Sequence, residues 1–128
     1  MAFTWPMSQI EVLDLGVLRE MGVVSGVAPG PETEEIIAIF LREERPRLPQ
    51  LEALFDQRSA ADLERGAHSL AGSCAILGAR QAQQVAIALE QAAKGADWNG
   101  VKALLAELRE AWARLESALA AHRARQRA

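Results

Sequence analysis

The sequence has little of what strands, disulfides and membrane spans require. Its 128 residues contain one cysteine and no tyrosine, and only two are threonine, a composition that disfavours β-strands. One cysteine excludes an intramolecular disulfide and any cysteine-clustered zinc site. The longest nearly uncharged stretch, residues 69–79, is far too short to cross a bilayer. The N-terminal residues also lack the basic start and apolar run of a signal peptide, so we expect a cytoplasmic protein with no membrane association.

The chain also lacks a strong excess of charge of either sign. The chain has 14 basic and 17 acidic side chains, a net charge of −3, whereas a nucleic-acid-binding domain of this size is usually basic. We therefore expect no nucleic-acid partner. What the sequence does contain is mostly Ala, Leu, Glu and Arg, residues that favour helices. The length is that of one domain, and an all-α domain is the expected fold class.

Hydrophobic residues at helical spacing predict helices at residues 15–21, 31–57, 60–77, 80–94 and from residue 98 onward. The second of these contains Pro46 and Pro49. We expect the prolines to bend this helix without ending it, because each removes a backbone donor and crowds the preceding turn. The four long helices are amphipathic and joined by short turns. They predict an antiparallel four-helix bundle over residues 13–128, with a short extra N-terminal helix, after an N-terminal arm at residues 1–12.

Residues at the helix ends agree with these boundaries. Asp14 and Asp97 are placed to cap helix N-termini, and Ser59 with Asp62 forms a capping-box-like start. Gly78 stands where a helix C-terminus tolerates a left-handed backbone.

His68 does not belong to the apolar seam of its helix. The seam consists of Leu63, Ala67, Leu70, Cys74 and Leu77. His68 lies one position past the seam, and at about 100° per residue its side chain points roughly 140° away from the seam's centre, towards solvent. Its neighbours on that surface are Ala61, Glu64, Gly72 and Ala75, three of which are very small.

Gly72 requires an explanation, because glycine inside a helix costs about 0.5–1 kcal/mol relative to alanine. One interpretation is that Gly72 permits close packing within the fold and that His68 is an ordinary surface histidine. The other is that small residues leave space beside the imidazole for a large partner.

Residues 67–79, AHSLAGSCAILGA, resemble the signature of histidine-containing phosphotransfer (HPt) domains. That family's pattern is A-H-x-L-K-G-S-x-x-x-L-G-A, on the second long helix of a four-helix bundle. The histidine, the glycine four residues later and the glycine ten residues later coincide with the helix and turn predicted independently. The resemblance extends to Leu13-Asp14-Leu15, to Phe40-Leu41-Arg42-Glu43 followed by Pro46, and to Leu89-Glu90.

The resemblance implies a phosphorelay intermediate with His68 as the phosphoryl acceptor. HPt domains accept a phosphoryl group from an aspartyl phosphate on one receiver domain and pass it to another. An exposed imidazole suits this role, because it is largely neutral and nucleophilic near pH 7. The implied partners are response-regulator receiver domains and a hybrid or sensor histidine kinase. The receiver brings Mg²⁺, so we expect this chain to bind no cofactor. We also expect a monomer. The sequence has no Gly-rich, Lys-containing phosphate loop, and we expect no kinase activity of its own.

The sequence departs from the family pattern at Ala71, where lysine is usual. An exposed cation near the phosphoryl group is worth about 0.3–1 kcal/mol, or a few-fold in rate. Its loss is expected to slow transfer. It is also consistent with a degenerate docking module that binds receivers without relaying phosphate. We expect Ala71, Gly72 and Ala75 to leave the imidazole accessible.

Register predicts which residues approach His68 from the next helix. If the two helices fold back at about residue 79, residue 68 lies level with residue 90. Glu90 is then placed to accept a hydrogen bond from the imidazole and fix its orientation. Lys94, one turn further, is a candidate for the missing positive charge, and Arg65 is a second. For each of these side chains the alternative is an ordinary solvated surface charge.

The sequence supports four further interpretations. Glu64, His68 and Glu90 form a minimal metal-ligand set, but metal sites in bundles use more carboxylates and face the interior, so no metal is expected. By analogy with the family, receivers are expected to dock on the short N-terminal helix and the first two long helices, where Val17 and Met21 are candidates. Cys74 is expected to be a buried, inert thiol. An unrelated four-helix structural protein remains the alternative if His68 has no role.

Overall fold

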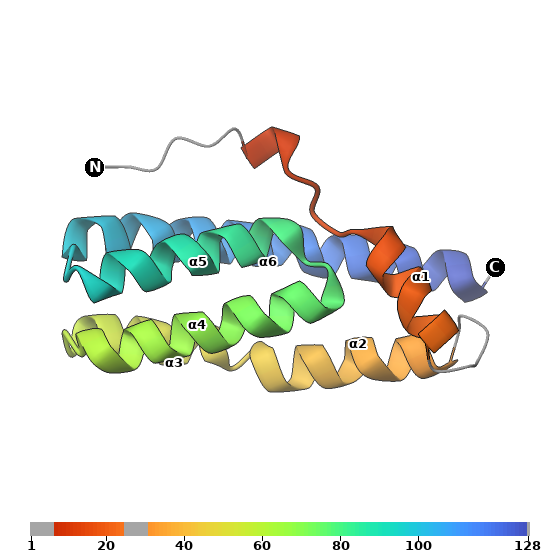
Figure 1. The fold of residues 1–128 in the computed structure, drawn as a ribbon, viewed down its shortest axis with the longest axis horizontal. Helices are drawn as coiled ribbons and strands as arrows, with labels where there is room; N and C mark the ends of the chain where they lie inside the picture. Colours follow the sequence, from red (N-terminus) through yellow and green to blue (C-terminus); the bar gives the residue numbers. More distant parts are fainter. Residues whose placement is uncertain (1–6, 25–30, 128) are drawn as a thin grey trace.

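The computed structural model describes residues 7–24 and 31–127, and within these ranges it contains helices and no strands (Figure 1). The elements are a 3₁₀ turn at Met7–Gln9 and α-helices α1 Leu15–Val24, α2 Pro31–Glu44, α3 Arg47–Asp56, α4 Ala60–Leu77, α5 Arg80–Lys94 and α6 Trp98–Arg127. Helices α2 and α3 follow one another along one side of the bundle, which α4, α5 and α6 complete, and α1 lies across one end (Figure 1). The predicted all-α bundle is confirmed.

The long helix predicted over residues 31–57 is two helices, so the expectation of one bent helix was wrong. Helix α2 ends at Glu44, and α3 begins at Arg47 after a two-residue turn. Pro46 occupies the N-cap position of α3 with φ −66° and ψ −16°. Pro49 lies in the first turn of α3, where a missing backbone N–H leaves no hydrogen bond unmade. Pro46 therefore separates the helices, whereas Pro49 is tolerated. Helix α1 also differs from expectation, because it continues past residue 21 to Val24.

The core is built from leucines and alanines on the inner faces of the long helices. Among the described residues, the largest fully buried side chains include Leu51, Leu63, Leu70, Leu89, Leu108 and Leu115. Helices α4 and α5 make the most extensive helix–helix contact of the described chain. Many of their buried residues are alanines, and small side chains allow two helix axes to approach closely. This close packing brings the exposed edges of α4 and α5 together.

The turn between α4 and α5 is short and tightly held. Gly78 has a left-handed backbone with φ +86°, as predicted. The Asp14 N–H donates to the Gly78 carbonyl oxygen over 2.8 Å. A Cβ atom at Gly78 would lie 3.0 Å from both the Asp14 carbonyl oxygen and the Val17 Cβ. Glycine is therefore required here by its backbone conformation and by the close approach of the start of α1.

The predicted caps are present with one difference. The carboxylate of Asp14 accepts the Gly16 N–H, and that of Asp97 accepts the Gly100 N–H, each over 3.0 Å. The Ser59 hydroxyl instead donates to the Asp62 carboxylate over 2.9 Å and makes no side-chain bond to the backbone.

A buried glutamine ties the described part of the N-terminal arm to the bundle. The amide nitrogen of Gln81 donates to the carbonyl oxygens of Met7 and Ile10 over 3.1 and 2.7 Å. Its amide oxygen accepts from Arg114 Nε of α6 over 2.8 Å. Residues 7–10 are thereby fixed against α5 and α6. In the ranges that the structure describes, no helix is both long and apolar enough to cross a membrane.

Candidate functional site

His68 stands near the middle of α4 and faces solvent, as the periodicity predicts. The seam residues Leu63, Ala67, Leu70, Cys74 and Leu77 are all buried. The side chain of His68 is 75% exposed. An imidazole in this position is open to a molecule approaching from outside the bundle.

The surface at Gly72, one turn after His68, is open in the part of the chain that the structure describes. A Cβ atom built at Gly72 would meet no neighbouring atom of the described structure within 4 Å. A Cβ atom at Gly66 of the same helix would instead lie 2.8 Å from Leu51 Cδ2. Close packing therefore explains Gly66 and does not explain Gly72. Ala75, one turn after Ala71, is partly exposed on this helix.

Glu90 of α5 contacts the imidazole from the neighbouring helix. Its Oε2 lies 3.0 Å from His68 Nδ1, and its side chain is only 21% exposed. A carboxylate accepts hydrogen bonds, so we assign the ring proton to Nδ1. The lone pair of the neutral ring is then on Nε2. The arrangement supplies an oriented nitrogen nucleophile at the surface.

Of the two candidates for the missing positive charge near His68, one is ion-paired within its own helix and the other, in the described part of the chain, is not. Lys94 is exposed near the end of α5 and makes no ion pair with the residues that the structure describes. Arg65, the second candidate for the missing cation, is ion-paired with Asp62 of its own helix. Glu64 is partly exposed one turn before His68. Within residues 7–24 and 31–127, no three His, Cys, Asp or Glu side chains come together as a metal site.

Comparisons with known proteins bear directly on this arrangement. The family model for the Hpt domain matches residues 35–126. The chain belongs to the HPt family. Its fold is also similar to the crystal structure of the histidine-containing phosphotransfer protein ZmHP2 from maize, with a TM-score of 0.77 and 21% sequence identity. That match covers 91% of this chain and 85% of the maize chain. None of the curated proteins matches the sequence.

Membership in the HPt family confirms the resemblance seen in residues 67–79. It places the chain in histidine phosphotransfer of two-component systems, in which HPt domains interact with receiver domains and kinases. The likeness to the maize protein is a likeness of fold.

Ala71 of this HPt domain lies in the core. It was expected to leave the imidazole accessible, and it is only 8% exposed. It follows Leu70 directly on α4, and both residues are buried. A lysine at this position would bury its stem and extend only its ammonium group to solvent.

An apolar groove lies between α2 and α4, and the sequence analysis did not identify it. Its volume is about 250 Å³. It is lined by Ile36, Ile39, Phe40, Glu43, Glu44, Ser73, Ile76 and Leu77. Ile76 follows His68 by two helical turns and is 70% exposed. The available signal was an isoleucine on the otherwise small and polar outer face of α4. Of the predicted docking residues, Val17 is partly buried beside Gly78, and the side chain of Met21 lies outside the described residues.

The single cysteine, Cys74, and the second histidine, His122, lie outside this site. Burial, together with the nearby Glu44 carboxylate, raises the pKa of the Cys74 thiol to about 12, so it stays protonated at neutral pH. His122 is half-buried on α6, and burial and the charge of Arg125 lower its pKa.

Proposed function

We propose that this HPt domain is a phosphorelay intermediate that carries a phosphoryl group on Nε2 of His68 between receiver domains. The observation that carries the proposal is the combination of a 75% exposed imidazole with a carboxylate 3.0 Å from its Nδ1. The open space at Gly72 adds access for a partner. Phosphoryl transfer requires mainly in-line positioning and charge neutralisation, so a bundle without a deep cleft suffices.

The transfer step needs no proton movement on this chain. The Nε2 lone pair attacks the phosphorus of the receiver's aspartyl phosphate, and an N–P bond forms as the bond to the aspartate oxygen breaks. The electron pair leaves with the aspartate carboxylate. The ring becomes a phosphoimidazolium that keeps its proton on Nδ1, and the Glu90 carboxylate stabilises this cation. The reverse step passes the phosphoryl group to a second receiver.

The charge on the phosphoryl group is neutralised mainly from outside this chain. We propose that the receiver supplies Mg²⁺ and that this HPt domain binds no cofactor. Lys94, one turn beyond Glu90 and exposed, is the proposed substitute for the family's usual lysine. An exposed charge of this kind contributes about 0.3–1 kcal/mol.

The receiver is proposed to dock across the groove between α2 and α4. The groove is largely apolar, and Ile39 and Ile76 on its two sides are exposed by 41% and 70%. Exposed isoleucines at a rim are typical of a surface that a partner protein covers. Ile76 lies on the same helix as the phosphoryl acceptor, so a protein on the groove also reaches the space beside Gly72. The proposed partners are response-regulator receivers and a hybrid or sensor histidine kinase.

The test is incubation with a panel of phosphorylated receivers, followed by measurement of acid-labile, base-stable label on this chain. We expect label on the wild type and none on His68→Gln. His122→Gln is the matched control, because the sequence has two histidines, and we expect it to retain full labelling. Label on His68→Gln would overturn the assignment.

A degenerate docking module is the second candidate, and the observation in its favour is Ala71 at the lysine position. Such a module would bind receivers in a titration without ever taking up label. It would bind His68→Gln as well as the wild type. Labelled wild-type protein excludes it.

A further inference from the structure

Glu44 is a buried carboxylate that the transfer step does not use. It is the last residue of α2 and is only 6% exposed. Its Oε1 accepts from Arg47 Nε over 2.7 Å, and its Oε2 accepts from the Ser73 hydroxyl over 2.9 Å. Burying a charged group is costly unless it is paired and hydrogen-bonded. Both oxygens of the Glu44 carboxylate are hydrogen-bonded, and one of them is paired with a guanidinium.

The two partners of Glu44 come from different helices. Arg47 is the first residue of α3, on the far side of the turn that contains Pro46. Ser73 is on α4, five residues after His68 and next to Gly72. One carboxylate therefore spans the break between α2 and α3 and joins the end of α2 to the helix that carries the phosphoryl acceptor.

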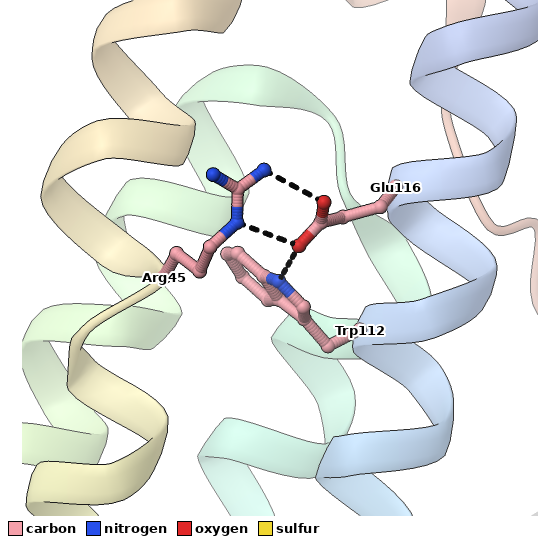
Figure 2. A network of polar contacts seen from close by, with 3 residues as sticks. All are labelled: Arg45, Trp112 and Glu116. Carbon is pink, nitrogen blue, oxygen red and sulfur yellow. Dashed lines mark hydrogen bonds and ion pairs between the residues drawn. The ribbon is translucent and has the colours of Figure 1, made fainter.

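The same turn is also held to α6 (Figure 2). Arg45 makes two hydrogen bonds to the Glu116 carboxylate, over 3.1 and 2.7 Å. Trp112 Nε1 also donates to this carboxylate, and the Trp112 ring stacks on Phe40 of α2 with centroids 5.4 Å apart. The end of α2 is thus fixed against α6 by one set of contacts and against α4 by Glu44.

The direction of α2 determines the shape of the groove. Ile36 and Ile39 of α2 form one wall, Ile76 of α4 belongs to the other, and Glu44 and Ser73 also line the groove. The break at Pro46 means that α2 does not take its direction from a continuous helix with α3. Its buried residues Ile37, Phe40 and Leu41 pack it into the core, and the contacts at its end fix where it stops relative to α4 and α6.

We propose that Glu44 is a positioning residue that holds the groove between α2 and α4 at the spacing a receiver domain requires. It acts on docking and does not touch the phosphoryl group. This inference rests on the proposed function, since it assigns the groove to a receiver.

The test is phosphoryl transfer to full-length protein at increasing concentrations of phosphorylated receiver. For Glu44→Ala we expect the half-saturating receiver concentration to rise roughly fivefold to tenfold, the net size of one typical hydrogen bond. The rate at saturation should stay within about twofold of the wild type, because the imidazole and Glu90 are unchanged. Ser73→Ala should share most of this effect, and Glu44→Gln, which keeps an acceptor oxygen, should recover part of the affinity.

Glu52→Gln is the matched control, because it removes a carboxylate that pairs with Arg109 between α3 and α6, away from the groove. We expect its half-saturating concentration to equal that of the wild type. Wild-type protein that takes no label would defeat the proposed function, whatever the Glu44 variants do. Wild-type protein that takes label, together with Glu44→Ala and Ser73→Ala that saturate as it does, would overturn the present inference alone. So would an unchanged half-saturating concentration with a lower rate at saturation. If Glu44→Ala does not fold, Ser73→Ala and Glu44→Gln decide.

Discussion

Gly72 offers a test in which stability and function should change in opposite directions. A Cβ atom at this position meets no described atom within 4 Å, so Gly72→Ala gains helix propensity at no steric cost. The expected gain is about 0.5–1 kcal/mol, or a rise in Tm of roughly 2–5 °C for a domain of this size. Gly72→Gln should be stabilised similarly, since glutamine is also a good helix former.

The same substitutions should reduce phosphoryl transfer, because the added atoms occupy the space that a docked receiver needs beside His68. Forcing extra atoms into a packed contact costs about 1–3 kcal/mol, or roughly fivefold to a hundredfold in transfer efficiency. We expect Gly72→Gln to show the larger loss. The assays are thermal unfolding followed by circular dichroism and label transfer from a phosphorylated receiver.

Two control variants make this prediction sharp. Gly66→Ala should be less stable than Gly72→Ala, because its Cβ would lie 2.8 Å from a side-chain carbon of the wholly buried Leu51. Ala106→Gln, at an exposed position of α6, should leave transfer unchanged. A lower Tm for Gly72→Ala would refute the claim of open space around Gly72. Wild-type transfer by the stabilised Gly72→Gln protein would refute the claim that a partner uses that space.

Other substitutions test the remaining parts of the site and the bundle. Glu90→Ala should slow transfer at saturating receiver by about tenfold, because the imidazole loses its fixed orientation, and Glu90→Gln should slow it less; equal rates for all three proteins would show that Glu90 has no such role. Lys94→Gln should slow transfer by about twofold to fivefold, and adding Ala71→Lys should restore the rate at some cost in stability, because position 71 is buried. No change on either substitution would contradict the charge assignment. The Arg45 guanidinium, together with the indole N–H of Trp112, holds the pKa of the Glu116 carboxyl below its usual value. The stabilising contribution of the ionised Glu116 carboxyl is therefore complete above its pKa in the unfolded chain. It is lost as the pH falls through the lower pKa that this carboxyl has in the folded protein. Urea unfolding between about pH 6 and 3 should show a shallower acid loss for Glu116→Gln than for the wild type, and parallel curves would be the contrary result.

Features of the site that depend on one helix, or on two helices joined by a short turn, could be predicted from the sequence. The seam of α4 fixes the direction of His68, because helical periodicity alone determines which side chains face outward. The contact with Glu90 follows from register, since Gly78 and Ala79 are the only residues between α4 and α5. Residues equally far from such a turn lie opposite one another.

The errors concern features that depend on several helices at once. Apolar residues keep helical spacing through Pro46, so periodicity alone does not distinguish a bend from a break. What holds the break is a pair of contacts between residues distant in sequence, Arg45 with Glu116 and Glu44 with Ser73. The burial of Ala71 likewise depends on how the neighbouring helices pack around α4. The groove exists only once α2 and α4 are both placed.

The openness around His68 also has a consequence for timing. A phosphoryl group on Nε2 would stand in water, since the ring is 75% exposed and the chain described here places nothing over the neighbouring Gly72. The described residues would then form no cover that retains or releases the phosphoryl group. How long the phosphoryl group persists would then depend on the spontaneous hydrolysis rate of phosphohistidine and on how soon a receiver domain binds. The partner proteins would therefore set the timing of the relay.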